Sequence, residues 1–153
     1  MKLFDANVLI DAYHPAPRNS ETPENPRHEQ ARRWLEAEIN RSEPFGMAEL
    51  VLSGFLGIVT SSKIFTPPVS TDAAIVEIDR LRKRPNCVMI RPGPRHYDIF
   101  TNLCRQGNAK GKLIADAYLA PLAVEHGCQW VSYDRDFARF PGLTWIDPGQ
   151  VKE

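Results

Sequence analysis

The stretch Leu3-Phe4-Asp5-Ala6-Asn7-Val8-Leu9-Ile10, close to the amino end of the chain, decides how we interpret the fold. It opens with a short apolar run that ends in an acid, Asp5. From Ala6 to Tyr13 the apolar residues then recur at helical spacing. This order predicts a strand, a turn and a first helix, with Asp5 at the carboxyl end of the strand.

The rest of the chain continues this alternation of strands and helices. Apolar residues at three- and four-residue steps predict amphipathic helices, and short apolar runs between turn residues predict strands. The expected helices cover Arg27 to Asn40, Met47 to Val59, Thr71 to Arg84, Pro94 to Arg105 and Leu113 to His126, and the expected strands cover Val88 to Ile90, Gln129 to Ser132 and Leu143 to Ile146. Such alternation indicates an α/β fold with a mainly parallel sheet, whose ligand site lies beyond the carboxyl ends of the strands.

Length and composition fit a single globular domain, residues 1–153. With 42% hydrophobic residues the chain can bury a core, and its 19 basic and 19 acidic residues balance, so net charge neither indicates nor excludes a nucleic-acid partner. Cys87, Cys104 and Cys128 lack the paired spacing of a zinc or redox site and are expected to be reduced core residues. We see no secretion signal and no apolar stretch long enough to span a bilayer, and we therefore expect a soluble cytoplasmic protein.

Four acids stand where predicted elements meet loops: Asp5, Glu49, Asp116 and Asp134. Metal-dependent phosphodiester cleavage needs converging carboxylates, because hard divalent cations prefer oxygen ligands. The alternative is that acids near helix N-termini simply complement the helix dipole and the free amides. Glu49 is harder to explain in this way, since we expect it on a buried apolar helix, where an ionised carboxylate is costly unless it is paired or coordinates a metal.

The opening stretch resembles the first motif of PIN domains, in particular of VapC-type toxins from toxin-antitoxin pairs. Three further segments, Ala48-Glu49-Leu50, Ile114 to Ala120 and Ser132 to Phe137, match in the family's order and at similar spacing. Together the matches cover nearly the whole chain. The resemblance implies a PIN-like three-layer α/β/α sandwich.

The resemblance also implies a ribonuclease that directs water at an RNA phosphodiester. Its catalytic residues and ligands for magnesium or manganese would be Asp5, Glu49, Asp116 and Asp134, with Asn7 and Ser132 as small polar neighbours and Asp136 as an acid that binds metal through water. A homodimer is implied too, as is a cognate VapB-type antitoxin whose carboxyl-terminal segment occupies the acidic groove.

Several features keep more than one interpretation. Lys110 and Lys112, just before the helix of Asp116, would either contact RNA phosphates or belong to a solvated loop. The proline-rich loop His14 to Pro26 would be a flap over the site, a partner contact or a plain mobile loop. Asp11 follows Asn7 by one helical turn and would border the pocket or face solvent.

Two other functions compete with a nuclease. A phosphoaspartate phosphohydrolase or receiver-like domain also has an acid after its first strand, but Asp5-Ala6-Asn7 lacks the second aspartate that many such hydrolases use. A catalytically inactive PIN-like protein that binds RNA or a partner would not need its carboxylates. The intact acids therefore favour the enzyme.

Overall fold

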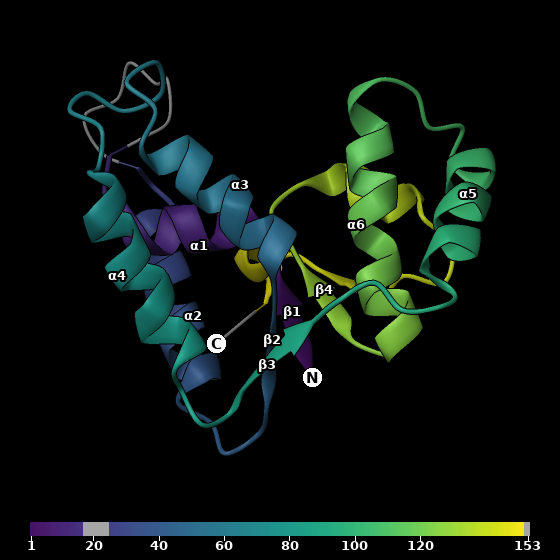
Figure 1. Ribbon diagram of the computed structural model, residues 1–153, viewed down its shortest axis with the longest axis horizontal. Coiled ribbons are helices and arrows are strands. Elements are labelled where there is room, and N and C mark those ends of the chain that lie inside the picture. The colour runs from purple at the N-terminus through teal and green to yellow at the C-terminus, as the bar shows by residue number, and fades with distance from the viewer. Residues whose placement is uncertain (17–24, 152–153) are drawn as a thin grey trace.

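The computed structural model describes residues 1–16 and 25–151 of the protein (Figure 1). Within them one sheet has the strand order β3-β2-β1-β4-β5. Its strands are β1 (Lys2–Phe4), β2 (Phe45–Ala48), β3 (Cys87–Ile90), β4 (Gln129–Val131) and β5 (Trp145–Ile146). All four pairings between them are parallel, which confirms the predicted parallel sheet.

Helices cover both faces of this sheet (Figure 1). One side carries α1 (Ala6–Tyr13), α2 (His28–Ile39), α3 (Glu49–Val59) and α4 (Thr71–Arg82), and the other carries α5 (His96–Gln106) and α6 (Lys112–His126). Two short 3-10 helices, η1 (Arg135–Arg139) and η2 (Pro148–Gln150), flank β5. The three-layer α/β/α sandwich is thus confirmed. In the part of the chain described, no helix is both long and apolar enough to cross a membrane.

The strand order creates a crevice at one place on the sheet. From β1 the chain adds β2 and then β3 on one side, and it then returns to place β4 on the other side of β1. At such a reversal the connections leave β1 and β4 in opposite directions, which opens a gap beyond their carboxyl ends. Asp5 follows β1 and Asp134 lies shortly after β4, so both acids border this gap.

The central strands are buried on both faces, because helices pack on each side. Leu3, Phe4, Trp130 and Val131 have no exposed surface. Such strands carry continuous apolar runs instead of alternating ones. Among the cysteines, Cys128 is buried and the other two are half-buried, and all three are free thiols, as expected.

Strand β2 corrects the sequence analysis. The prediction of one helix from Met47 to Val59 is wrong at its start, because Met47 and Ala48 belong to β2 and the helix begins at Glu49. Residues 45–48 are all buried, and they pair with β1 on one side and β3 on the other. A short apolar run of this kind does not distinguish a buried strand from a buried helix by its periodicity.

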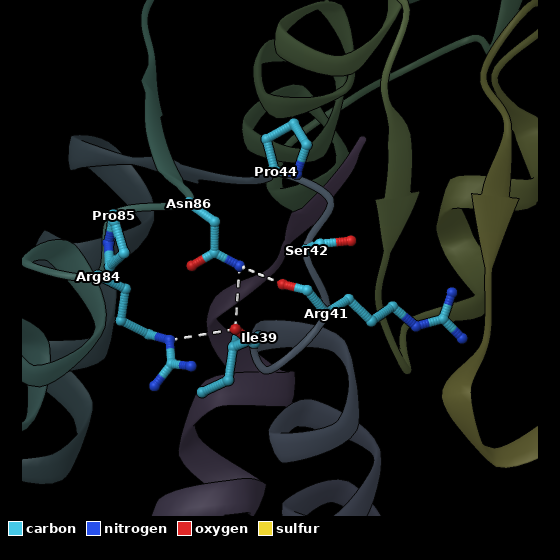
Figure 2. A pocket seen from close by; sticks show the side chains of 7 residues that line it. All are labelled: Ile39, Arg41, Ser42, Pro44, Arg84, Pro85 and Asn86. Carbon is cyan, nitrogen blue, oxygen red and sulfur yellow. Dashed lines mark hydrogen bonds between the residues drawn. The ribbon is translucent and has the colours of Figure 1, made fainter.

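A hollow of about 500 Å³ lies at the opposite, amino-terminal edge of the sheet, between the loops that enter β2 and β3 (Figure 2). The Asn86 side-chain amide bridges these loops, since it donates to the carbonyl oxygens of Ile39 and Arg41 at 3.0 and 2.9 Å. Arg84 donates to the same Ile39 oxygen at 3.1 Å. The polar groups in this hollow therefore hold the loops together, far from the acidic edge.

Candidate metal centre

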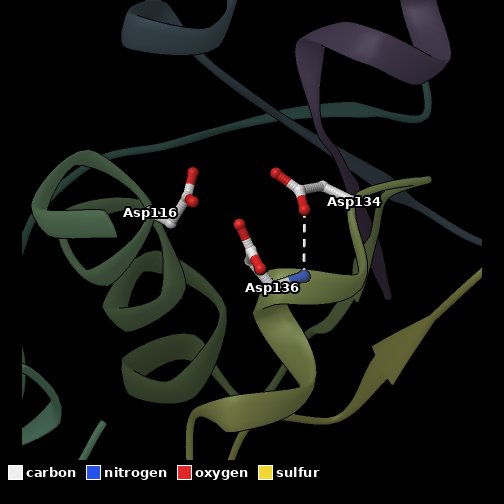
Figure 3. Close-up of side chains that lie close together, drawn as sticks. All are labelled: Asp116, Asp134 and Asp136. Atoms are coloured by element: carbon white, nitrogen blue, oxygen red, sulfur yellow. Dashed lines mark hydrogen bonds between the residues drawn. The ribbon is translucent and has the colours of Figure 1, made fainter. Parts of the chain in front are cut away.

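Three carboxylates converge beyond the carboxyl ends of the central strands (Figure 3). Asp116 comes from the second turn of α6, Asp134 from the loop after β4, and Asp136 from the first turn of η1. One oxygen from each lies within 4.8 Å of the others. Asp116 and Asp134 are half-buried and Asp136 is exposed. Such a set of hard oxygen donors suits a divalent cation such as Mg²⁺ or Mn²⁺.

Asp5 lies beside this trio at the end of β1, with only 8% of its surface exposed. Its Oδ1 accepts from the backbone N–H of Ala6 at 2.7 Å, which caps α1. Its Oδ2 accepts from the Ser132 hydroxyl at 2.7 Å and from the Asn7 amide at 3.2 Å. These bonds fix the orientation of the carboxylate at the crevice.

Asn7 and Ser132 join the ends of the two central strands. The Asn7 amide nitrogen donates to Ser132 Oγ at 2.9 Å, and its oxygen accepts from the backbone N–H of Tyr133 at 3.1 Å. Ser132 Oγ also accepts from the backbone N–H of Asp134 at 3.0 Å. The fully buried Ser132 hydroxyl therefore connects two of the acids, Asp5 and Asp134.

The crowding of negative charge shows in Asp116. Burial, and to a smaller extent the neighbouring charges of Asp134, Asp5 and Asp136, together raise the pKa of its carboxyl from 3.8 to about 6. A carboxylate cluster of this kind is destabilised by mutual repulsion, and a bound divalent cation would relieve it.

Glu49 lies at the same sheet edge but outside the trio. Its side chain is 60% exposed and its Oε1 accepts from Arg91 Nη2 at 2.8 Å. The expectation of a buried Glu49 is therefore wrong: Val51, Leu52, Phe55 and Val59 of α3 are buried, but the helix begins with two exposed residues, Glu49 and Leu50. No sequence motif points to Arg91, whose only signal is its place directly after β3.

The structure shows that Asp11 is buried. Asp11 is 3% exposed and accepts from the Asn25 amide at 3.1 Å, so it does not face solvent. Its carbonyl oxygen lies 2.8 Å from His28 Nδ1, and Asp11 thus links α1 to the start of α2.

Lys110 and Lys112 are exposed just ahead of Asp116. Of the loop His14 to Pro26, residues 17–24 lie outside the described residues.

Comparison with known proteins agrees with this architecture. The PIN domain family model matches residues 2–143. Ribonuclease VapC43 of Mycobacterium tuberculosis is 38% identical over 148 residues, which cover 97% of this chain and 95% of that protein. Ribonuclease VapC31 of the same species is 36% identical, over 97% of this chain and 99% of that protein.

Solved structures share the fold at much lower identity. VapBC2 from Rickettsia felis, bound to a promoter DNA fragment, aligns with a TM-score of 0.64 at 16% identity over 95% of this chain and 96% of that one. VapC20 of Mycobacterium tuberculosis, a toxin that cleaves the sarcin-ricin loop, aligns with a TM-score of 0.60 at 15% identity over 94% and 98%. By its fold and its full-length relatives, this chain belongs to the PIN-domain family, among the VapC ribonucleases.

Proposed function

We propose that this chain is a divalent-metal-dependent ribonuclease that hydrolyses RNA phosphodiesters and is the toxin of a type II toxin-antitoxin pair, inhibiting translation or growth. The observation that carries the proposal is the convergence of Asp116, Asp134 and Asp136 within 4.8 Å at the strand-order reversal. The names of relatives that are 34–38% identical over most of the chain support RNA as the substrate.

In this proposal Asp5, Glu49, Asp116 and Asp134 hold Mg²⁺ or Mn²⁺. Asp136 supports them through a water. When bound, such a cation polarises a phosphate oxygen and lowers the pKa of a water. Glu49 reaches this centre only if its side chain leaves Arg91, and its exposure makes that rotation inexpensive.

The remaining residues of the centre position the acids. Ser132 and Asn7 donate to the same oxygen of Asp5, so these two hydrogen bonds hold Oδ2 in place. Asp134 presents Oδ1 to the backbone N–H of Asp136 at 2.9 Å, which fixes its rotamer at the start of η1. Because these carboxylates are already oriented without a ligand, less conformational entropy is lost when a metal binds.

The proposal extends to partners and setting. Structures of similar fold are VapBC toxin-antitoxin complexes, which supports a VapB-type antitoxin as the partner. The proposal also includes a homodimer of single-domain chains. In this proposal Lys110 and Lys112, both exposed and just ahead of Asp116 in the chain, contact RNA phosphates. The proposal includes a cytoplasmic location, which is consistent with an RNA substrate.

The test is cleavage of total RNA by purified protein in Mg²⁺, Mn²⁺ or chelator. Asp116→Asn is assayed beside the wild type, and Asp98→Asn, an exposed acid in the first turn of α5, is the matched control. We expect cleavage that needs metal, disappears in Asp116→Asn and persists in Asp98→Asn. If wild type and Asp116→Asn both bind RNA and leave it intact with every metal, the chain is a binding protein and the enzyme is refuted.

A further inference from the structure

An apolar groove has Asp5, one acid of the candidate centre, in its lining. It has a volume of about 560 Å³ and runs between α3 and α6, the helices on either side of the sheet in Figure 1. Its lining also includes Leu50, Tyr118 and Phe100. A second hollow of about 440 Å³ shares Leu50 and Tyr118 with the first and has Arg91 in its lining. The shared residues join the two hollows into one path, with Asp5 in the lining of the first and Arg91 in that of the second.

Tyr118 is held as a rigid platform in the middle of this path. Its ring packs edge-to-face on Phe100 and His96, with ring centroids 5.4 and 4.5 Å away. His96 Nε2 also lies 2.9 Å from the Tyr118 carbonyl oxygen. The ring is only half-buried, so part of it faces the groove. An unpaired base can stack on such a ring whatever its identity.

Arg91 is held at the far end by a stiff loop. Pro92 and Pro94 restrict the backbone after β3, and the Glu125 carboxylate accepts from the N–H groups of Gly93 and Arg95 at 2.9 and 3.0 Å. The Arg91 side chain is 68% exposed, and its pairing with the equally exposed Glu49 is weak. The ion pair with Glu49 uses one of the five N–H donors of the Arg91 guanidinium, so a phosphate can compete with Glu49 for Arg91.

We propose that this groove binds the single-stranded RNA that adjoins the cleaved bond, with a base stacked on Tyr118 and a phosphate on Arg91. The inference rests on the proposed ribonuclease function and names the contacts that hold its substrate. Continuity with Asp5 makes the groove the direct extension of the reaction site. An aromatic lining next to a cation matches the base and phosphate of one strand, whereas a purely apolar partner would use only the aromatic part of the groove.

The experiment measures binding of a fluorescent, unstructured RNA oligonucleotide by anisotropy in an Asp116→Asn background, which keeps the RNA intact. Arg91→Gln is expected to weaken binding about 5- to 10-fold and to flatten the dependence of log Kd on log salt by about 0.7, the change for one lost phosphate contact on a single strand. Arg91→Lys should restore the slope. Arg82→Gln, an exposed arginine in the last turn of α4, is the control and should change neither value.

Tyr118→Leu is expected to weaken binding about 10-fold without changing the salt slope, because stacking is lost and charge is not. Tyr118→Phe should bind like its parent, which separates the ring from the fold. Equal affinity and slope for Arg91→Gln and its parent would overturn the proposal. So would an unchanged affinity in Tyr118→Leu together with a fall in molecular mass, since the groove would then be a contact between two copies.

Wild-type cleavage of total RNA, run in parallel, separates this proposal from the proposed function. If the wild type cleaves RNA and the groove variants bind normally, the enzyme stands and the groove is refuted. If the wild type does not cleave RNA, the proposed ribonuclease function is refuted independently of the results for the groove variants.

Discussion

Replacing Asp116 by asparagine should make the metal-free protein more stable. Burial and the charges of Asp134, Asp5 and Asp136 raise the pKa of Asp116 from 3.8 to about 6. That rise corresponds to about 3 kcal/mol against the ionised form in the folded state. An amide has no charge to repel, but it keeps part of the cost of burial. We therefore expect a gain of about 2 kcal/mol, or about 4 to 8 °C in Tm.

The gain in stability of Asp116→Asn should depend on pH in a way that identifies its cause. Between pH 3.8 and about 6 the folded protein binds more protons at Asp116 than the unfolded chain does, so its stabilising contribution falls as pH rises through this window. The full penalty is present above the folded-state pKa and is absent below 3.8. Asp116→Asn should thus melt above the wild type at pH 7.5 and together with it near pH 3.5.

The assay is thermal unfolding followed by circular dichroism, in chelator and in saturating Mn²⁺. Mn²⁺ should raise the Tm of the wild type and have a much smaller effect on Asp116→Asn. Asp72→Asn, an exposed acid in the first turn of α4, is the control and should gain no stability. Equal Tm values for wild type and Asp116→Asn in chelator at pH 7.5 would refute the repulsion inferred from the geometry.

Three further changes separate the site from the scaffold. Ser132→Ala removes a buried hydroxyl that is hydrogen-bonded to Asp5, Asn7 and Asp134, so it should lower the free energy of unfolding in urea by about 1 to 3 kcal/mol and also lower kcat for RNA cleavage. An unchanged kcat would show that the hydroxyl does not position the acids. Asn86→Ala should cost a similar amount of stability but leave RNA cleavage per folded molecule unchanged, because its bonds lie at the opposite sheet edge. Lowering the pH through about 6 should weaken Mn²⁺ stabilisation of the wild type, as Asp116 protonates, and calorimetric titration at pH 5 and 7.5 would detect this.

The local pattern of the chain determined much of this structure. Asp5 follows an apolar run and opens a helix, and its place at a strand end depends on neighbouring residues alone. The same holds for Asp134 after β4. Because strands in a parallel sheet share one carboxyl edge, the alternation of elements was enough to predict that these two acids lie on the same side.

Other features of the protein depend on the tertiary structure, through the order of the strands and the burial of side chains. Residues 45–48 are a strand because β1 and β3 pair with them on both sides, and four apolar residues alone do not specify that. Exposure of Glu49 depends on where α3 meets the sheet edge, and its pairing with Arg91 depends on β2 and β3 being neighbours. The groove over Tyr118 joins residues more than 60 positions apart, such as Leu50 and Tyr118, and only the packing of α6 against the sheet brings them together. Local sequence selects helix or strand, but long-range contacts determine which side chains share a surface.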